Sequence, residues 1–188
     1  VQAVGIKRNS LIFRFAYFLS RWIYLKADKI AISSRLFTKY FAEVLKIAGD
    51  QIYLPAYAEG IFNDIKRTDN KKQKGQIDLL FAGNIGKMQS VETIIKAANM
   101  LKEEQNIIFH IVGDGSALSD CIALTKQFGL ENTVKFYGQK PLAEMPDFYN
   151  MADAFLVTLN ANEIVSYTLP NKVQSYMAAG KPILGAID

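Results

Sequence analysis

Histidine and cysteine are almost absent from this sequence, which has one of each among its 188 residues. A single thiol excludes an internal disulfide framework and suits a reducing compartment. Zinc and iron sites need several cysteine or histidine ligands at close spacing, so the sequence predicts no metal site. We expect Cys121 to pack in the core and His110, which lies within an apolar run, to be a hydrogen-bonded strand residue.

Long apolar runs are also missing. The most apolar stretch, residues 11–25, is interrupted by Arg14 and Arg21. A helix needs about 20 apolar residues to cross a bilayer core of roughly 30 Å, so we do not expect this segment to span a membrane. A signal-peptide pattern is absent as well. These absences favour a cytoplasmic protein.

Positive charge is concentrated at one end of the chain. Residues 1–50 hold nine Lys and Arg against three Asp and Glu, a formal charge of +6, and the remainder carries −2. This bias indicates a local anionic neighbour rather than nucleic acid bound along the whole chain. Lys7, Arg14 and Arg21 recur every seven residues and form a basic stripe that leads into the predicted helix 10–27, where aromatic residues surround it. Two interpretations stay open: a helix buried against neighbouring elements, or a helix that contacts the inner surface of the membrane.

From residue 77 onward, short apolar runs alternate with helical patterns. Strands are predicted at 77–83, 107–113, 134–138, 154–159 and 182–187, and helices at 90–104, 117–128, 141–151 and 170–179. Such alternation requires right-handed crossovers and a parallel sheet with helices on both faces, so the fold class is α/β and Rossmann-like. We further expect Ser90 and Ser116 to be helix N-caps and Gly129 to end a helix.

The segment before this alternation divides into two parts. Residues 63–76 are polar and charged, which is typical of a linker. Residues 1–62 carry the patterns of a helix at 10–27, a strand at 29–33, a helix at 34–48 and a strand at 51–54;. We therefore expect a partial helical and strand segment at 1–62, a linker at 63–76 and a Rossmann-like domain at 77–188.

The turn after the first strand of that domain is rich in glycine. Gly83, Asn84, Gly86 and Lys87 close one apolar run and precede a helix. Glycine lets backbone N–H groups approach an anion, and the following helix directs its positive dipole end at the same spot. The turn therefore predicts a phosphate site with Lys87 as its cation. A plain tight turn with a solvated lysine is the alternative.

Ligands of open parallel sheets bind beyond the carboxyl ends of the strands, so the later loops should converge on the same crevice. After the second strand, Gly113, Asp114 and Gly115 predict another close backbone approach. Asp114 would orient a ligand hydroxyl or, alternatively, stabilise its own turn. After the third strand, Tyr137 and Gln139 are candidates to flank a base.

The last predicted helix carries a cation in an unfavourable place. Pro170 and Asn171 mark its start, and Lys172 lies in its first turn, where a positive charge opposes the helix dipole;. A bound anion would remove this conflict, so the position favours a functional lysine.

These motifs, with the block Tyr176–Pro182, resemble the nucleotide-sugar-binding C-terminal domain of group 1 (family 4) retaining glycosyltransferases, which is one half of a GT-B fold. The resemblance covers residues 77–188, and residues 1–62 are similar to the end of the companion N-terminal domain. Within the family, the chain resembles the branch that makes bacterial capsule, exopolysaccharide or lipopolysaccharide O-antigen.

The resemblance implies a retaining transfer of sugar from a nucleotide-diphosphate donor, expected to be a UDP-sugar, to a lipid-linked or polysaccharide acceptor, without a cofactor or an obligatory metal. It assigns the donor diphosphate to Gly83, Asn84, Gly86, Lys87 and Lys172. The nucleotide and sugar are assigned to Gly113, Asp114, Gly115, Tyr137, Gln139, Pro170, Asn171 and Ser175. A non-catalytic nucleotide-binding or assembly module and a nucleotide-sugar epimerase of related architecture stay open as alternatives.

The chain departs from the family pattern at four positions. The arginine that commonly follows the first glycine is Asn84 here, and the lysine further along that loop is Gln89. The family's two glutamates, seven residues apart, would fall on Tyr167 and Ser175, and Glu163 lies four residues too early to replace the first. Because the second glutamate is expected on the ribose hydroxyls, the resemblance implies a weaker hydroxyl contact from Ser175.

Overall fold

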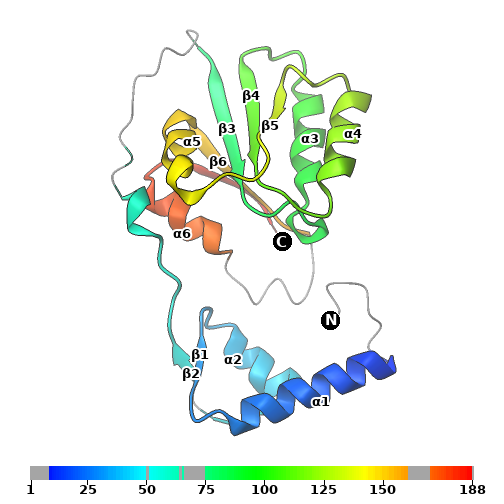
Figure 1. Ribbon diagram of the computed structural model, residues 1–188, viewed down its shortest axis with the longest axis vertical. Coiled ribbons are helices and arrows are strands. Elements are labelled where there is room, and N and C mark those ends of the chain that lie inside the picture. The colour runs from blue at the N-terminus through cyan, green and yellow to red at the C-terminus, as the bar shows by residue number, and fades with distance from the viewer. Residues whose placement is uncertain (1–8, 50, 64, 66–74, 161–169, 188) are drawn as a thin grey trace. The chain divides into compact units, whose positions relative to one another are not determined.

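The computed structural model describes residues 9–49, 51–63, 65, 75–160 and 170–187 (Figure 1). The chain divides into two compact units. Within the described residues, the first unit comprises 9–49, 51–56 and Pro170, and the second comprises 57–63, 65, 75–160 and 171–187.

The second unit is built on a parallel sheet of five strands in the order β5-β4-β3-β6-β7. The strands are β3 (Ile77–Ala82), β4 (Ile107–Val112), β5 (Val134–Phe136), β6 (Ala154–Thr158) and β7 (Ile183–Ala186). The connecting helices are α3 (Val91–Met100), α4 (Leu118–Gln127), α5 (Met145–Met151) and α6 (Asn171–Ala178). This confirms the predicted α/β alternation. The chain passes from β3 through β4 to β5 on one side and then crosses to β6 on the other, so β3 lies where the strand order reverses;.

The two faces of this sheet have separate cores. Leu79 and Phe81 lie in one core with residues of α3 and α4, and Leu80 and Ala82 lie in the other with residues of α5 and α6. Figure 1 shows the two pairs of helices on either side of the sheet. The alternation follows from the two-residue period of a strand. Burial on both faces explains why the strands read as continuous apolar runs. Cys121 is buried in the first of these cores, as predicted.

The predicted helix boundaries are confirmed in part. Ser90 occupies the N-cap position of α3 as predicted, but its φ is +47° and it makes no capping bond; its hydroxyl contacts Glu92 and Thr93 instead. Ser116 is not an N-cap, because α4 begins one residue later than such a cap requires. Gly129 does end α4: its φ is +67°, and the next amide, Leu130 N–H, donates to the Thr125 carbonyl;.

The boundary between the units lies earlier than predicted. Phe62 is 3% exposed and its ring stacks on Tyr149 of α5, 4.5 Å between centroids. Residues 57–63 therefore pack with the second unit, although the sequence analysis placed 57–62 with the first. Phe62 explains the difference, because an aromatic side chain at the edge of a polar segment gains by burial in the core.

The first unit is small. It comprises α1 (Leu11–Lys26), β1 (Ile30–Ile32), α2 (Phe37–Lys39) with a π-helical continuation at Tyr40–Val44, and β2 (Gln51–Tyr53), which pairs parallel with β1. Its core gathers Ile32, Phe41, Leu45 and Ile47.

Helix α1 contacts the rest of this unit through Tyr17 and Arg21, whereas Arg14 is exposed and Lys7 lies outside the described residues. Arg21 donates to the Leu45 carbonyl at 3.1 Å, and the Tyr17 hydroxyl donates to the Val44 carbonyl at 3.2 Å. Leu11, Phe15, Phe18 and Trp22 are exposed, and no residue of α1 is fully buried. Among the described residues, no helix has the length and apolar content to cross a membrane.

Lys181 fixes the end of α5. Its ammonium donates to the carbonyl oxygens of Tyr149, Asn150 and Ala152, at 2.5, 2.7 and 2.7 Å. Carbonyls at a helix C-terminus have no partner within the helix, and a cation there also interacts favourably with the negative end of the dipole.

We predict that Lys181→Met lowers the free energy of unfolding by about 1–3 kcal/mol, because it leaves part-buried carbonyls unpaired. Urea unfolding at pH 7 measures this. Lys135→Met is the matched control, since its exposed ammonium donates to one carbonyl, that of Glu131. Equal stability losses in the two variants would contradict the assigned role.

Candidate functional site

A cavity of about 540 Å³ lies in the second unit at the carboxyl edge of the sheet. The loops after β3, β4 and β5 and the first turn of α6 converge on it, as the topology predicts;. The predicted site residues from the three loops that line it are Gly83, Asn84, Gly113, Asp114 and Gln139. Helix α6 adds Asn171, Lys172 and Ser175. Five other predicted residues, Gly86, Lys87, Gly115, Tyr137 and Pro170, are not among the lining residues.

Lys172 places a buried positive charge at this cavity. Its ammonium nitrogen lies 3.6 Å from the centre of the Phe81 ring and is buried without a hydrogen-bond partner among the described residues. Burial lowers the pKa of Lys172 from 10.5 to about 8;. A buried donor of this kind costs free energy until it is paired, so the site favours an anion that accepts from it.

Gly83 makes room for that ammonium. Its φ is +146°, and a Cβ at this position would stand 2.9 Å from the Lys172 nitrogen. Tyr176, one helical turn after Lys172, anchors the helix: its hydroxyl bonds the backbone N–H and carbonyl of Ala82. Residues four apart share a helix face, so the same contact that fixes α6 directs Lys172 toward the end of β3.

Gly113 and Gly115 bring two loops together. A Cβ on Gly113 would stand 1.9 Å from the Gly83 carbonyl oxygen, and one on Gly115 would stand 2.5 Å from the Ile85 carbonyl oxygen. The Ile85 N–H donates to the Asp114 carbonyl at 2.7 Å, across the same contact. These glycines therefore give close approach between loops, whereas the sequence analysis expected approach to a ligand.

The Asp114 side chain makes the turn contact that one of the two alternatives predicted. Its carboxylate accepts the N–H of Gly115 at 2.6 Å. The side chain still borders the cavity, but one of its oxygens is committed to the backbone.

Lys87 does not share the cavity with Lys172. It lines a separate hollow of about 560 Å³ together with Glu92 and Asp120. The reason is the 3-10 turn at Lys87–Gln89, which is tied to the end of β6: Thr158 donates to the Gln89 carbonyl and Asn160 to the Lys87 carbonyl. Lys87 and Lys172 therefore do not line the same cavity, although the sequence predicts that they do. The second lysine of the cavity is Lys140, whose ammonium lies 3.5 Å from the Glu144 carboxylate.

Ser175 is buried beneath the cavity and its hydroxyl is already bonded. It donates to the Lys172 carbonyl at 2.9 Å and lies 2.9 Å from the Tyr149 hydroxyl. Burial raises the pKa of Tyr149 to about 12, so this phenol stays protonated and donates to Ser175;. Ser175 therefore has one acceptor lone pair left for a ligand.

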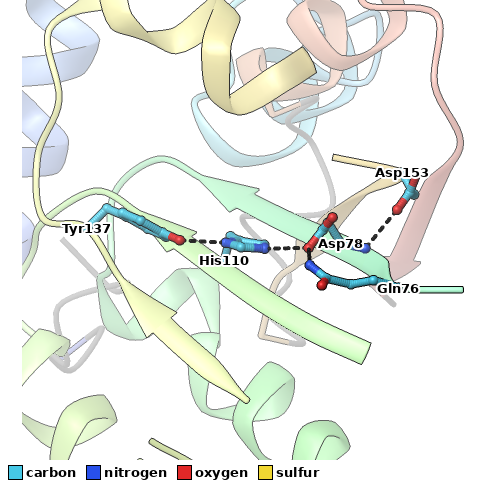
Figure 2. Close-up of polar contacts among 5 residues, drawn as sticks. All are labelled: Gln76, Asp78, His110, Tyr137 and Asp153. Atoms are coloured by element: carbon cyan, nitrogen blue, oxygen red, sulfur yellow. Dashed lines mark hydrogen bonds and ion pairs between the residues drawn. The ribbon is translucent and has the colours of Figure 1, made fainter. Parts of the chain in front are cut away.

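Tyr137 belongs to a polar chain inside the sheet (Figure 2). Its hydroxyl lies 2.7 Å from His110 Nδ1, and His110 Nε2 lies 2.9 Å from the Asp78 carboxylate. Gln76 donates to the same carboxylate, and the Asp78 N–H donates to Asp153. His110 is thus the hydrogen-bonded strand residue that the sequence predicts. The Tyr137 hydroxyl is bonded to this chain, and Tyr137 is not among the residues that line the cavity, so its contact with a base stays a prediction.

Three further predictions can be placed only in part. Pro170 immediately precedes α6. Tyr167 and Glu163 lie outside the described residues. Within the described part of the chain, no cluster of three or more His, Cys, Asp or Glu side chains has the arrangement of a metal site.

We predict that Tyr137→Phe lowers the free energy of unfolding by about 1 kcal/mol, because His110 loses a buried partner. The affinity for UDP should change less than twofold, since Tyr137 is not at the cavity. Urea unfolding and isothermal titration calorimetry measure the two effects. A large loss of UDP affinity at unchanged stability would restore the base contact that the sequence suggested.

Lys172→Met should stabilise the folded chain at pH 7. A pKa lowered from 10.5 to about 8 corresponds to about 3 kcal/mol of cost for the charged form, and the contact with Phe81 offsets about 1–2 kcal/mol of it;. We expect a net gain on the order of 1–2 kcal/mol.

The gain should depend on pH. Below pH 8 Lys172 is charged in both states and the full cost is present; between about pH 8 and 10.5 only the unfolded chain binds the proton, so wild-type stability rises toward that of the variant;. Urea unfolding at pH 7 and pH 10 measures this convergence. A variant less stable than wild type at both pH values would contradict the buried, unpaired charge.

Comparison with known proteins agrees with the fold. The sequence pattern of the family "Glycosyl transferases group 1" matches residues 62–186. The probable glycosyltransferase WbjE of Pseudomonas aeruginosa is 28% identical over 197 aligned positions, which cover 100% of this chain and 48% of WbjE. The chain thus spans about half the length of this relative.

Solved structures show the same architecture. WaaG, a glycosyltransferase involved in lipopolysaccharide biosynthesis, superposes with a TM-score of 0.78 at 17% identity, covering 95% of this chain and 50% of WaaG. Alr3699/HepE of Anabaena, solved in complex with UDP and glucose, gives 0.67 at 16% identity, covering 92% of this chain and 47% of HepE. With the family pattern extending over most of its length, the chain belongs to the group 1 glycosyltransferases.

Proposed function

We propose that the second unit binds the diphosphate of a nucleotide-sugar donor, expected to be a UDP-sugar, and that the protein to which this chain belongs transfers the sugar with retention of configuration. The observation that carries the proposal is the buried ammonium of Lys172, unpaired among the described residues, at the glycine turn after β3. The complex of HepE with UDP and glucose supports the choice of a uridine nucleotide.

Charge on the leaving group is the physical centre of this reaction. When the sugar departs, the diphosphate gains negative charge, and a cation placed in advance in a site of low polarity lowers the barrier. Lys172 meets that requirement, because Phe81 and Gly83 hold its ammonium at the cavity before any ligand arrives. The proposal gives this task to the protein's own cation and does not require a metal ion.

The proposal also includes the class of acceptor. The role of WaaG in lipopolysaccharide biosynthesis supports a lipid-linked or polysaccharide acceptor in surface-polysaccharide synthesis. Since the chain spans 48% of WbjE, we assign acceptor binding, and any acid or base for the transfer, to residues outside the cavity described above.

We predict that Lys172→Met weakens binding of both UDP and inorganic pyrophosphate at least tenfold at pH 7, because it removes a charge-assisted hydrogen bond. Lys87→Met is the matched control and should change either affinity less than threefold, since Lys87 lines a different hollow. Isothermal titration calorimetry of this chain, with EDTA present, measures both. Unchanged pyrophosphate binding by Lys172→Met, or the larger loss in Lys87→Met, would overturn the proposal.

A further inference from the structure

We propose that Glu59 is the specificity-determining residue that accepts the 2′ and 3′ hydroxyls of the donor's ribose. The inference rests on the proposed function, because it names the part of the same ligand that lies beyond the diphosphate. Glu59 lines the same cavity as Lys172, although the sequence analysis assigned it no role.

A ribose presents two neighbouring hydroxyl donors, and an ionised carboxylate accepts both because it has two oxygens and no proton. Among the described residues that line the cavity, the carboxylates are those of Glu59 and Asp114. Asp114 already accepts the Gly115 N–H at 2.6 Å. Ser175 has one lone pair left, as its hydroxyl donates to the Lys172 carbonyl and receives the Tyr149 proton. Glu59 is thus the cavity acceptor best able to take a pair of donors.

The backbone of Glu59 is held in place while its side chain is left for a ligand. Its carbonyl accepts the N–H of Phe62 at 3.1 Å, and the Phe62 ring is buried on Tyr149. Glu59 precedes the 3-10 turn Gly60–Phe62, a position where a carboxylate often caps the turn, but the side chain makes no capping bond;. Its side chain is therefore not used to hold the turn.

The carboxylate of Glu59 acts electrostatically on Tyr149, the hydrogen-bond partner of Ser175. Together with burial, it contributes to the raised pKa of Tyr149, whose hydroxyl bonds Ser175. A carboxylate near a diphosphate site repels the phosphate charge unless the ligand also supplies donors to it. This gives Glu59 a signature that a structural role lacks: it should favour a nucleotide with a ribose diol and should not favour free pyrophosphate.

Glu59→Gln keeps the shape of the side chain and removes its charge. Isothermal titration calorimetry of this chain at pH 7 would compare UDP, 2′,3′-dideoxy-UDP and inorganic pyrophosphate, with the GDP and ADP pairs run in parallel because the diol is common to all bases. We expect Glu59→Gln to weaken UDP at least tenfold. Dideoxy-UDP should stay within twofold, and pyrophosphate should stay the same or bind more tightly.

Asp114→Asn is the matched control, since it neutralises the other cavity carboxylate; it should not discriminate between UDP and its dideoxy analogue. Equal losses for UDP and dideoxy-UDP in Glu59→Gln, or a diol-specific loss in Asp114→Asn, would overturn the assignment. Failure of the proposed function looks different: in that case wild type binds neither pyrophosphate nor nucleotide, or Lys172→Met binds both as wild type does. Equal melting temperatures of Glu59→Gln and wild type show that the fold is intact.

Discussion

The site depends on one costly interaction, the burial of the Lys172 ammonium against the Phe81 ring without a hydrogen-bond partner among the described residues. An isolated charge in such a place lowers the stability of the free protein, and the lowered pKa expresses the same cost;. An anion that enters the cavity relieves it. The folded protein is therefore less stable with the cavity empty than with an anion bound, and the Lys172 ammonium is already in position when the anion enters.

The rest of the second unit serves to hold that lysine in position. The strand order reverses at β3, and this reversal opens the crevice. The Tyr176 hydroxyl bonds the last residue of β3 and so fixes α6 against that strand. Gly83 has no side chain to block the ammonium, and Gly113 lets the neighbouring loop pack directly on Gly83. The glycine-rich loops thus shape the cavity mainly through contact with each other.

Local patterns in the sequence were enough for the sheet, the helices and the choice of Lys172. Apolar periodicity identifies strands and helices because burial on two faces leaves a regular trace, and Lys172 stood out because a cation conflicts with a helix start. Local sequence patterns did not predict side-chain positions that depend on residues distant in the sequence. Lys87 is turned to another hollow by Thr158 and Asn160, about seventy residues further along the chain, and Tyr137 is held by His110.

The role of residues 57–63 also depends on contacts with residues that are distant in the sequence. Phe62 in a polar stretch was the available signal that this segment docks on the second unit, and only its stacking on Tyr149 reveals that Glu59 reaches the cavity. Local patterns in the sequence instead grouped residues 57–62 with the first unit. Packing of Phe62 against Tyr149 places this segment beside the cavity, which Glu59 lines.

The central claim is that Lys172 is a buried cation awaiting an anion, and its titration tests this most directly. The ¹³Cε resonance of Lys172, identified by its loss in Lys172→Met, would be followed by NMR from pH 6 to 11 with and without inorganic pyrophosphate. The account predicts a midpoint near pH 8 in the free protein and a clear upward shift when pyrophosphate is bound. A midpoint near the ordinary lysine value of about 10.4 that pyrophosphate leaves unchanged would contradict it.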